Sequence, residues 1–400
     1  MLASVKFDVA IVGAGLTGLS LAFALALAGR RVAVIDARAA TPAQARAPGE
    51  AFDPRVYAIS PASARWLSEL HIWQALDPAR TSPVYNMRVS GDGAGNLASR
   101  IDLSAYKSGV GELCTIVEES ELARVLAAAA GFAPGISLLR PAHAVQLRTE
   151  SNGAMLTLAD GRVIEVELVV ACDGAQSWTR AAAGIEVDAI AYGQTAIVAN
   201  FDCAHAHHGR ALQWFRHEGD GATSVLAWLP LPGRRVSIVW SLDTVTSDRM
   251  IAMDDGEFAR AAAAAGGNVL GDFTLCGKRA TFPLCNQRAR ALAGARVALA
   301  GDAAHLIHPL AGQGLNLGFG DCAALARGLA GARDCGAPGL LRAYERERKA
   351  ALLEMHAVTH GLARLFASRH PALRALRNIG LNLSARLPVV PQLIVRAALH

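Results

Sequence analysis

The chain has 400 residues, of which 52% are hydrophobic and 18% are charged. This composition excludes a disordered protein, and the length favours two joined domains over one core. Seven cysteines without a CxxC pair argue against a disulfide framework or a zinc module, and they favour a reducing compartment.

Residues 6–36 predict a strand, a glycine turn, a helix and a second strand. KFDVAIV and RVAVID read as short buried strands, and LTGLSLAFALALAG reads as a helix that ends at Gly29. The glycines interrupt the apolar run, so we expect neither a signal peptide nor a membrane span there. A βαβ unit of this kind implies a parallel sheet.

The turn has the sequence Gly13-Ala14-Gly15-x-x-Gly18, and Asp36 ends the second strand. The first glycine permits a tight turn, the second lets the backbone approach a pyrophosphate, and the third allows close helix packing. Asp36 can accept hydrogen bonds from a ribose hydroxyl. The motif predicts a dinucleotide site, but alone it does not distinguish FAD from NAD.

The following segments alternate between helices and strands. SPASARWLSELHIWQAL and ESELARVLAAAA predict amphipathic helices, and residues 82–103 predict strands. Asp160-Gly161 predicts the turn of a hairpin. Strand-like runs between residues 190 and 284 predict an antiparallel sheet, after which RVALAGD returns to the buried-strand style and LNLGFGDCAALARGLAG predicts a helix. We therefore expect a β domain inserted between separated segments of the first domain.

Two carboxylates directly follow predicted buried strands. Asp173, with Gly174, follows VELVVA, and Asp302, with Gly301, follows RVALA. Ligands of open α/β sheets bind at the carboxyl ends of strands. In isolation, each aspartate is equally consistent with a turn or a helix cap.

Together these motifs resemble the group A flavoprotein aromatic hydroxylases, the relatives of p-hydroxybenzoate hydroxylase. HPLAGQGLNLGFGD (308–321) is similar to a signature of their ubiquinone-biosynthesis branch, as are FDPRVYAISPASARWLSEL, DGAQSWTRAAAGI and AYGQTAIVANF. The resemblance implies that FAD is held by four groups of residues: the ADP half by Gly13, Ala14, Gly15, Gly18 and Asp36, with Arg55 near the phosphates; FAD and NAD(P)H by Asp173 and Gly174; the ribityl chain by Gly301 and Asp302; and the flavin ring by Pro309, Gly312, Gln313, Gly314, Leu315 and Asn316.

The glycines around Gln313 also have a physical reading. They expose backbone N–H groups at a positive helix end, which stabilises negative charge at the flavin N1/O2 edge. No catalytic residue is assigned, since the flavin supplies the oxygen chemistry. His205, His207 and His208 lack metal-ligand spacing, so we expect no metal site.

The implied function is an FAD-dependent monooxygenase that hydroxylates the aromatic ring of a polyprenyl phenol in ubiquinone biosynthesis, with NAD(P)H and O₂ and through a C4a-hydroperoxyflavin. A same-fold hydroxylase of a small soluble aromatic acid is one alternative. A flavin-binding assembly component without turnover is another, and an NAD-dependent dehydrogenase, which would be colourless, is a third. A halogenase is disfavoured because the WxWxIP motif is absent.

The expected fold is α/β, with a Rossmann-like FAD-binding domain, an inserted, mostly antiparallel β-sheet substrate domain and a C-terminal helical segment. The FAD-binding domain takes residues 1–81, 113–180 and 285–345, the substrate domain takes 82–112 and 181–284, and the helices take 346–400. Residues 341–400 hold ten Lys/Arg and three Asp/Glu, which predicts a basic amphipathic surface for a membrane or a biosynthetic complex. We expect a cytoplasmic protein, peripheral at the inner face of the membrane, without a nucleic-acid partner.

Overall fold

The computed structural model describes residues 5–39, 51–91, 100–217, 223–307 and 313–367. It begins with the predicted βαβ unit, in which β1 (Val5–Val12) leads through α1 (Leu16–Leu27) to the parallel strand β2 (Val32–Ile35). All four residues of β2 are buried, as expected for a strand covered on both faces. The prediction of a parallel sheet is confirmed.

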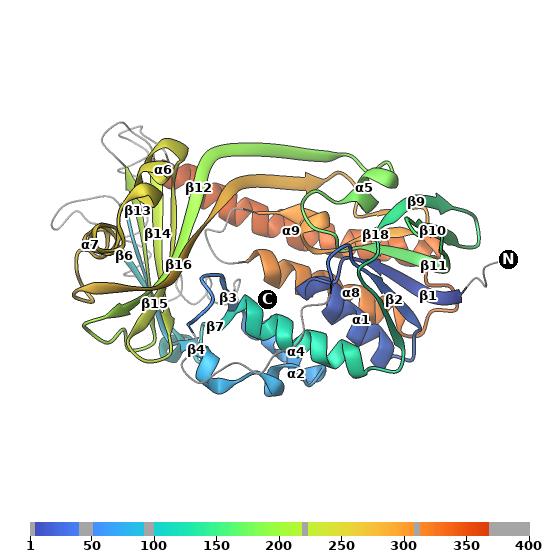
Figure 1. Ribbon diagram of the computed structural model, residues 1–400, viewed down its shortest axis with the longest axis horizontal. Helices are drawn as coiled ribbons and strands as arrows, with labels where there is room; N and C mark the ends of the chain where they lie inside the picture. Colours follow the sequence, from blue (N-terminus) through green and yellow to red (C-terminus); the bar gives the residue numbers. More distant parts are fainter. Residues whose placement is uncertain (1–4, 40–50, 92–99, 218–222, 308–312, 368–400) are drawn as a thin grey trace.

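This parallel sheet gathers strands from distant parts of the chain (Figure 1). Its path runs β17-β18-β11-β1-β2-β8, and the predicted hairpin adds β10 and β9. The remaining strands are β8 (Ile136–Leu139), β9 (Ala144–Thr149), β10 (Ala154–Leu158), β11 (Val163–Ala171), β17 (Ala293–Gly294) and β18 (Val297–Leu299). The pairs β1–β11, β2–β8 and β11–β18 are parallel, so their carboxyl ends lie along one edge.

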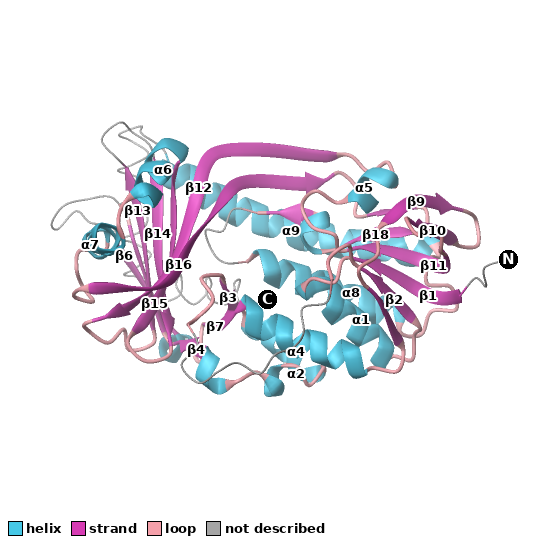
Figure 2. Cartoon of the chain, viewed as in Figure 1, coloured by secondary structure: helices cyan, strands magenta, loops and turns pink. Residues whose placement is uncertain are grey.

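The second sheet is mostly antiparallel, as predicted, and has the order β19-β16-β12-β15-β14-β13-β5-β6 (Figure 2). Among the strand pairs that the described residues form within it, only β13–β5 is parallel. Its strands are β5 (Asn86–Ser90), β6 (Arg100–Ser104), β12 (Val187–Cys203), β13 (Arg210–His217), β14 (Thr223–Leu231), β15 (Arg235–Asp243), β16 (Phe273–Ala289) and β19 (His305–Leu306). The long strands β12 and β16 extend from this sheet toward the parallel half.

The two faces of the antiparallel sheet have different neighbours. One face packs on α6 (Thr244–Ala252) and α7 (Asp255–Ala265) through a core that includes Trp228 and Phe258. The opposite face meets the small sheet β3-β7-β4, where Phe52 and Ile116 share a cluster with Leu231. The strands of the small sheet are β3 (Val56–Ile59), β4 (Thr81–Val84) and β7 (Cys114–Glu118).

Helices surround the parallel sheet. Helix α1 packs against α4 and α8, and α8 packs against α9. The remaining helices are α2 (Pro61–Glu69), α3 (Ala105–Ser108), α4 (Glu119–Phe132), α5 (Trp178–Ala182), α8 (Gly314–Leu329), α9 (Pro338–Ala367) and the 3₁₀ turns η1 (Trp73–Ala75), η2 (Pro78–Arg80) and η4 (Gly301–Ala303). The helix expected over residues 60–76 ends earlier, because His71 adopts φ +58° and the chain turns to bury Ile72.

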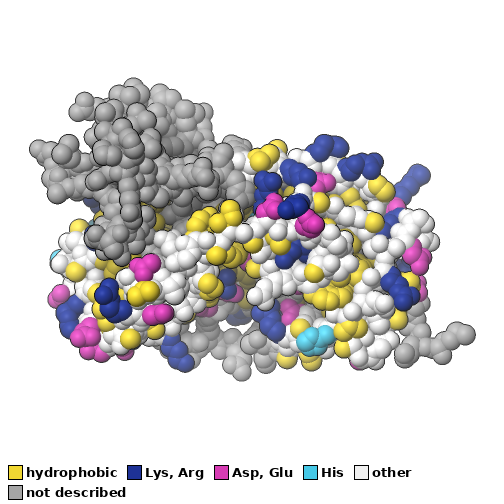
Figure 3. Space-filling model, turned by 90° about the horizontal axis from the view of Figure 1, so that it is seen from above, with side chains coloured by type: hydrophobic (Ala, Val, Ile, Leu, Met, Phe, Trp, Pro, Cys, Tyr) yellow, Lys and Arg dark blue, Asp and Glu magenta, His cyan; other side chains and the backbone are white. Residues whose placement is uncertain are grey.

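Of the C-terminal helices expected over residues 346–400, the part from residue 368 onward lies outside the described residues. Within the described part of the chain, no helix is long and apolar enough to cross a membrane. On the face seen in Figure 3, Lys and Arg side chains gather over the end that carries the parallel sheet, with acidic side chains among them. The division into numbered domains remains our proposal.

Candidate cofactor site

Close backbone contacts shape the first glycine turn. Gly13 has φ +106°, and its N–H donates to the Ile35 carbonyl at 2.7 Å. A Cβ atom on Gly13 would lie 2.2 Å from the Cys172 carbonyl oxygen, and one on Gly18 would lie 1.9 Å from the Gly13 carbonyl oxygen. Only glycine fits at both positions. The turn therefore brings the ends of β1 and β11 against the start of α1.

The start of α1 faces open space. No side chain caps the helix at Gly15, and a Cβ atom on Gly15 would have no neighbouring heavy atom within 4 Å. The free N–H groups of the first helical turn and the positive end of the helix dipole favour an anion at this point. The N–H of Ala14 is already engaged, since it donates to Asp36 Oδ2 at 2.7 Å. The turn fits a pyrophosphate beside Gly15.

Asp36 is a buried anion at the end of β2. Its Oδ1 accepts the Arg38 N–H at 2.7 Å, and the Arg38 guanidinium pairs with it at 3.3 Å. Burial acts to raise the pKa of Asp36, but the hydrogen bonds from Arg38 and Ala14 outweigh burial and lower it. The carboxylate is therefore ionised at neutral pH and can accept further hydrogen bonds, as a ribose hydroxyl requires.

Charges from four separate elements meet next to this turn. Arg55 pairs with Glu119 at 3.0 Å, and its guanidinium lies over the rings of Tyr57 and Phe282. Burial raises the pKa of Glu119, while Arg55 and Arg38 lower it and Asp302 raises it further. Such coupling requires proximity. The end of β2, the segment before β3, the start of α4 and the Gly301-Asp302 motif therefore surround one region.

The Gly301-Asp302 motif lies against the first glycine turn. Gly301 has φ +62°, and a Cβ atom on it would lie 2.9 Å from Thr17 Oγ1 on α1. Asp302 makes no hydrogen bond to the described residues, and burial raises the pKa of its carboxyl group. A partly buried carboxylate without such a partner suits the hydroxyl groups of a ligand. The residues present thus fit a flavin dinucleotide.

Replacement of Asp302 by asparagine should separate binding from stability. Because burial raises the folded-state pKa above 3.8, the carboxylate destabilises the protein as pH rises through this range. We expect D302N without added FAD to unfold at the same temperature as the wild type or higher, while its FAD dissociation constant rises about ten-fold. Thermal unfolding and flavin fluorescence measure the two effects. A large fall in melting temperature would contradict this interpretation.

The Asp173-Gly174 motif has a visible local role. Asp173 accepts from Ser177 Oγ at 2.5 Å and from the N–H and Oγ1 of Thr179 at 2.9 Å, and it thereby binds the first turn of α5, whose N-cap is Ser177. Buried Arg180 then donates to the carbonyls of Ala303 and Ala175 at 2.9 and 3.0 Å. A cofactor role for Asp173 and Gly174 remains a proposal. Arg180, which the sequence argument did not single out, joins this motif to the Gly301-Asp302 motif.

A buried charge network stabilises the Gly301-Asp302 motif. Asp321 accepts the Gly301 N–H at 2.9 Å, and it contacts His305 Nε2 and Arg348 Nε at 2.7 Å each. Burial acts to raise the pKa of Asp321, but His305 and Arg348 outweigh burial and lower it. Sequence patterns did not indicate this function of Asp321 and Arg348. Their only signal was an acidic residue on the apolar face of the α8 helix.

The start of α8 faces the same region. Gln313 is the N-cap residue of α8, and its side chain accepts no hydrogen bond from the first turn. A Cβ atom on Gly314 would have no neighbouring heavy atom within 4 Å. Asn316 instead binds protein, because its Oδ1 accepts the Ser60 N–H at 2.9 Å and its Nδ2 donates to the Ala58 carbonyl at 2.8 Å. Leu315 packs against the main core. Pro309 and Gly312 lie outside the described residues.

The three predicted motifs therefore surround one sheet edge, and they define a nucleotide-binding α/β protein with an added antiparallel sheet. The chain matches the FAD binding domain family over residues 6–358. It is 35% identical to the ubiquinone hydroxylase UbiL of Rhodospirillum rubrum, covering 98% of this chain and 89% of the relative. It is 32% identical to the 3-demethoxyubiquinol 3-hydroxylase of Escherichia coli, covering 98% of each. The chain belongs to this family, the FAD-dependent monooxygenases of the ubiquinone-hydroxylase group.

Solved structures show the same fold at low sequence identity. The p-nitrophenol 4-monooxygenase PnpA of Pseudomonas putida matches with a TM-score of 0.78 and 18% identity over 98% of each chain. A variant of Klebsiella pneumoniae HpxO complexed with FAD matches with a TM-score of 0.76 and 17% identity, over 98% of each chain. The predicted fold class and the FAD cofactor are confirmed. NAD(P)H is the reductant typical of the family.

Proposed function

We propose that this monooxygenase hydroxylates the aromatic ring of a polyprenyl phenol on the way to ubiquinone, with NAD(P)H and O₂ as co-substrates. The likeness to ubiquinone hydroxylases over nearly the whole chain is the observation that carries this proposal. When bound, FAD supplies the redox and oxygen chemistry. The protein positions the reactants and excludes water around them.

The inner face of the antiparallel sheet supports an uncharged substrate. Arg55 over Phe282 marks where this face meets the cofactor region. Phe282 begins a row of paired residues that crosses the neighbouring strands through Ala196, Ser241, Val225 and Phe215. The following row consists of Ala280, Val198, Val239, Ala227 and Gln213.

Neither row contains an ionisable side chain. A benzoate-type substrate requires a cation for its carboxylate, because an unpaired buried charge is strongly unfavourable. A phenol with an apolar tail requires only apolar contacts and one or two hydrogen bonds, one of which Ser241 can offer. These rows therefore favour the polyprenyl phenol over the small aromatic acid.

Complementation tests the proposal. We expect the chain to restore ubiquinone in one of a set of Escherichia coli strains that each lack a single ring hydroxylase, with quinone profiles read by mass spectrometry. The intermediate that disappears identifies the ring position. Failure in every strain, together with rapid NAD(P)H oxidation by the purified enzyme on p-hydroxybenzoate, would favour the aromatic acid instead. A yellow protein that does not oxidise NAD(P)H in the presence of any phenol would support the assembly component.

The basic C-terminal segment, residues 341–400, bears on where in the cell the enzyme acts. A polyprenyl substrate resides in the membrane, so we propose that the enzyme is cytoplasmic and binds the inner face of the membrane through this segment. We expect co-sedimentation with liposomes that contain anionic lipid, and release as salt is raised. A protein that stays in the supernatant at low salt would refute the contact.

A further inference from the structure

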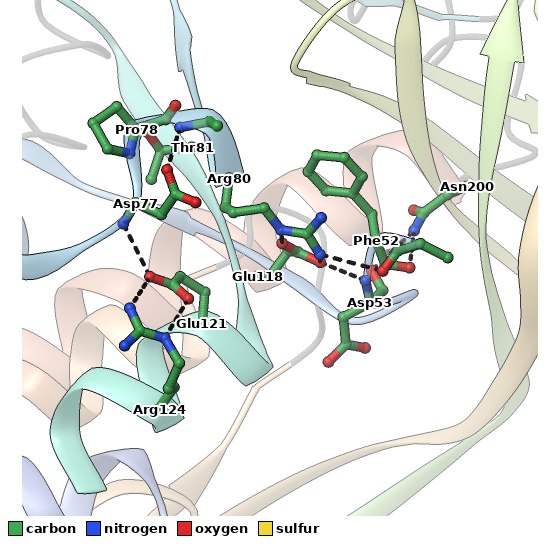
Figure 4. Close-up of polar contacts among 12 residues, drawn as sticks. Phe52, Asp53, Asp77, Pro78, Arg80, Thr81, Glu118, Glu121, Arg124 and Asn200 are labelled. Carbon is green, nitrogen blue, oxygen red and sulfur yellow. Dashed lines mark hydrogen bonds and ion pairs between the residues drawn. The ribbon is translucent and has the colours of Figure 1, made fainter. Parts of the chain in front are cut away.

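Residues 51–55, here called the Arg55 segment, are held by side chains from both halves of the molecule (Figure 4). The segment leads into β3 and carries Arg55 to the cofactor region. Residues 51–55 lie in neither a strand nor a helix, and side chains bind their backbone at several points. Their arrangement shows how the site is built.

From the cofactor half, the end of β7 and the start of α4 bind the Arg55 segment at three points. The buried Glu118 carboxylate accepts the Asp53 N–H at 2.5 Å. The next residue, Glu119, donates its N–H to the Arg55 carbonyl at 3.0 Å and pairs with the Arg55 guanidinium. Consecutive glutamates thus hold the backbone and the side chain of the same segment.

Arg80 completes this contact. It pairs with Glu118 at 2.5 Å and donates to the Ala51 carbonyl at 3.2 Å. Its guanidinium carbon lies 4.0 Å from the centroid of the Phe52 ring. Glu118 is fully buried, and a buried carboxylate is tolerated only with such charged and hydrogen-bonding partners. The pair therefore fixes Ala51, Phe52 and Asp53 together.

From the sheet half, β12 and β15 hold the same residues. Asn200 Nδ2 on β12 donates to the carbonyls of Phe52 and Asp53 at 3.0 and 2.9 Å. Arg235 on β15 places its guanidinium carbon 4.9 Å from the Phe52 ring centroid. Asn200 is 1% exposed, so these hydrogen bonds are shielded from water. The antiparallel sheet therefore contacts the segment that carries Arg55.

We propose that Glu118 and Asn200 are positioning residues for the cofactor, which act by fixing Arg55 through residues 51–55. The proposal rests on the proposed placement of Arg55 at the FAD phosphates. It extends the cofactor site to two buried side chains that do not contact the ligand, one from each half of the protein.

Glu121 provides a matched control for Glu118. It is 2% exposed, accepts the Asp77 N–H at 2.9 Å and pairs with Arg124 at 2.7 Å. Glu121 thus shares burial, an arginine partner and a capped backbone N–H with Glu118, but it holds the Asp77 turn and not the Arg55 segment (Figure 4). Replacing each carboxylate by its amide removes one charge without changing shape.

The experiment compares E118Q, E121Q, N200A and R55Q as full-length holoenzymes. Dilution and flavin fluorescence give the FAD dissociation constant, and thermal unfolding without added FAD gives stability. We expect E118Q and R55Q to raise the dissociation constant about ten-fold and N200A about five-fold. E121Q should lower the melting temperature as much as E118Q but leave FAD affinity unchanged. The double variant E118Q/R55Q should bind no more weakly than R55Q, because both act on one contact.

The outcomes separate the two levels of the proposal. Equal loss of FAD affinity in E118Q and E121Q would mean that Glu118 serves stability alone. Weak binding by R55Q with wild-type binding by both E118Q and N200A would refute the positioning proposal and leave the cofactor role of Arg55 intact. Wild-type binding by R55Q would refute that role itself. If E118Q does not fold, N200A carries the same test from the sheet side.

Discussion

Replacement of Gly18 by alanine is expected to give a colourless protein. The added Cβ atom would lie 1.9 Å from the Gly13 carbonyl oxygen and 3.3 Å from Cys172 Cβ. Moving the Gly13 carbonyl away would disturb the hydrogen bond from the Gly13 N–H to the Ile35 carbonyl. The turn must therefore open at the point where we place the pyrophosphate. We expect FAD affinity to fall by a factor of about 100 or more, with a stability loss of roughly 1–3 kcal/mol.

Absorbance near ~450 nm relative to protein absorbance reports the flavin content of the purified variant. Gly131 in α4 gives a matched control, because a Cβ atom there would meet no neighbouring heavy atom within 4 Å. We expect G131A to remain yellow and to gain about 0.5–1 kcal/mol of stability. A G18A protein that retains FAD at wild-type affinity would disprove the close approach in the turn.

Replacement of Asp321 by asparagine is expected to cost about 3 kcal/mol of unfolding free energy, because it leaves a buried arginine without its counter-ion. Asp321 contacts the Gly301 N–H, His305 and Arg348 and is fully buried. The variant should also lose FAD affinity, since Gly301 precedes Asp302. Chemical denaturation at neutral pH measures the stability change.

The D321N variant should also change how the unfolding free energy depends on pH. The folded-state pKa of Asp321 lies below the ordinary value of 3.8, so the carboxylate stabilises the protein fully above that value. This contribution is lost as pH falls from about 4 through the folded-state pKa. The stability gap between wild type and D321N should therefore shrink in acid. The control E347Q removes an exposed pair with Arg327 and should cost less than about 0.5 kcal/mol. A gap that persists unchanged below pH ~3 would contradict the assigned ionisation.

Local sequence patterns predicted most of the fold because they are set by short-range physics. The glycine spacing predicted the turn at Gly13, and the Asp160-Gly161 pair predicted the hairpin of β10 and β11. The early end of α2 was missed, because the burial of Ile72 depends on the tertiary core and not on helical periodicity. The small sheet β3-β7-β4 was also missed, since its strands are separated by long stretches of chain.

The candidate site shows the same division. Spacing identified the motif residues that we propose for the cofactor, and Asp302 and Asp36 lie where the parallel sheet required. Arg180, Glu118 and Asp321 were not found, because each acts through a partner more than twenty residues away or through a backbone carbonyl that no pattern marks. A buried charge is visible in a sequence only when its counter-ion is adjacent.

The parallel sheet also constrains how the chain is made. β18 pairs with β11, yet β12 to β16 are synthesised between them. During translation, residues 169–171 of β11 lack their β18 partner until the inserted sheet has left the ribosome. Exposed strand edges recruit other chains. Heterologous expression should therefore give more intact protein at low temperature or with abundant chaperones, and truncation before Val297 should give aggregates.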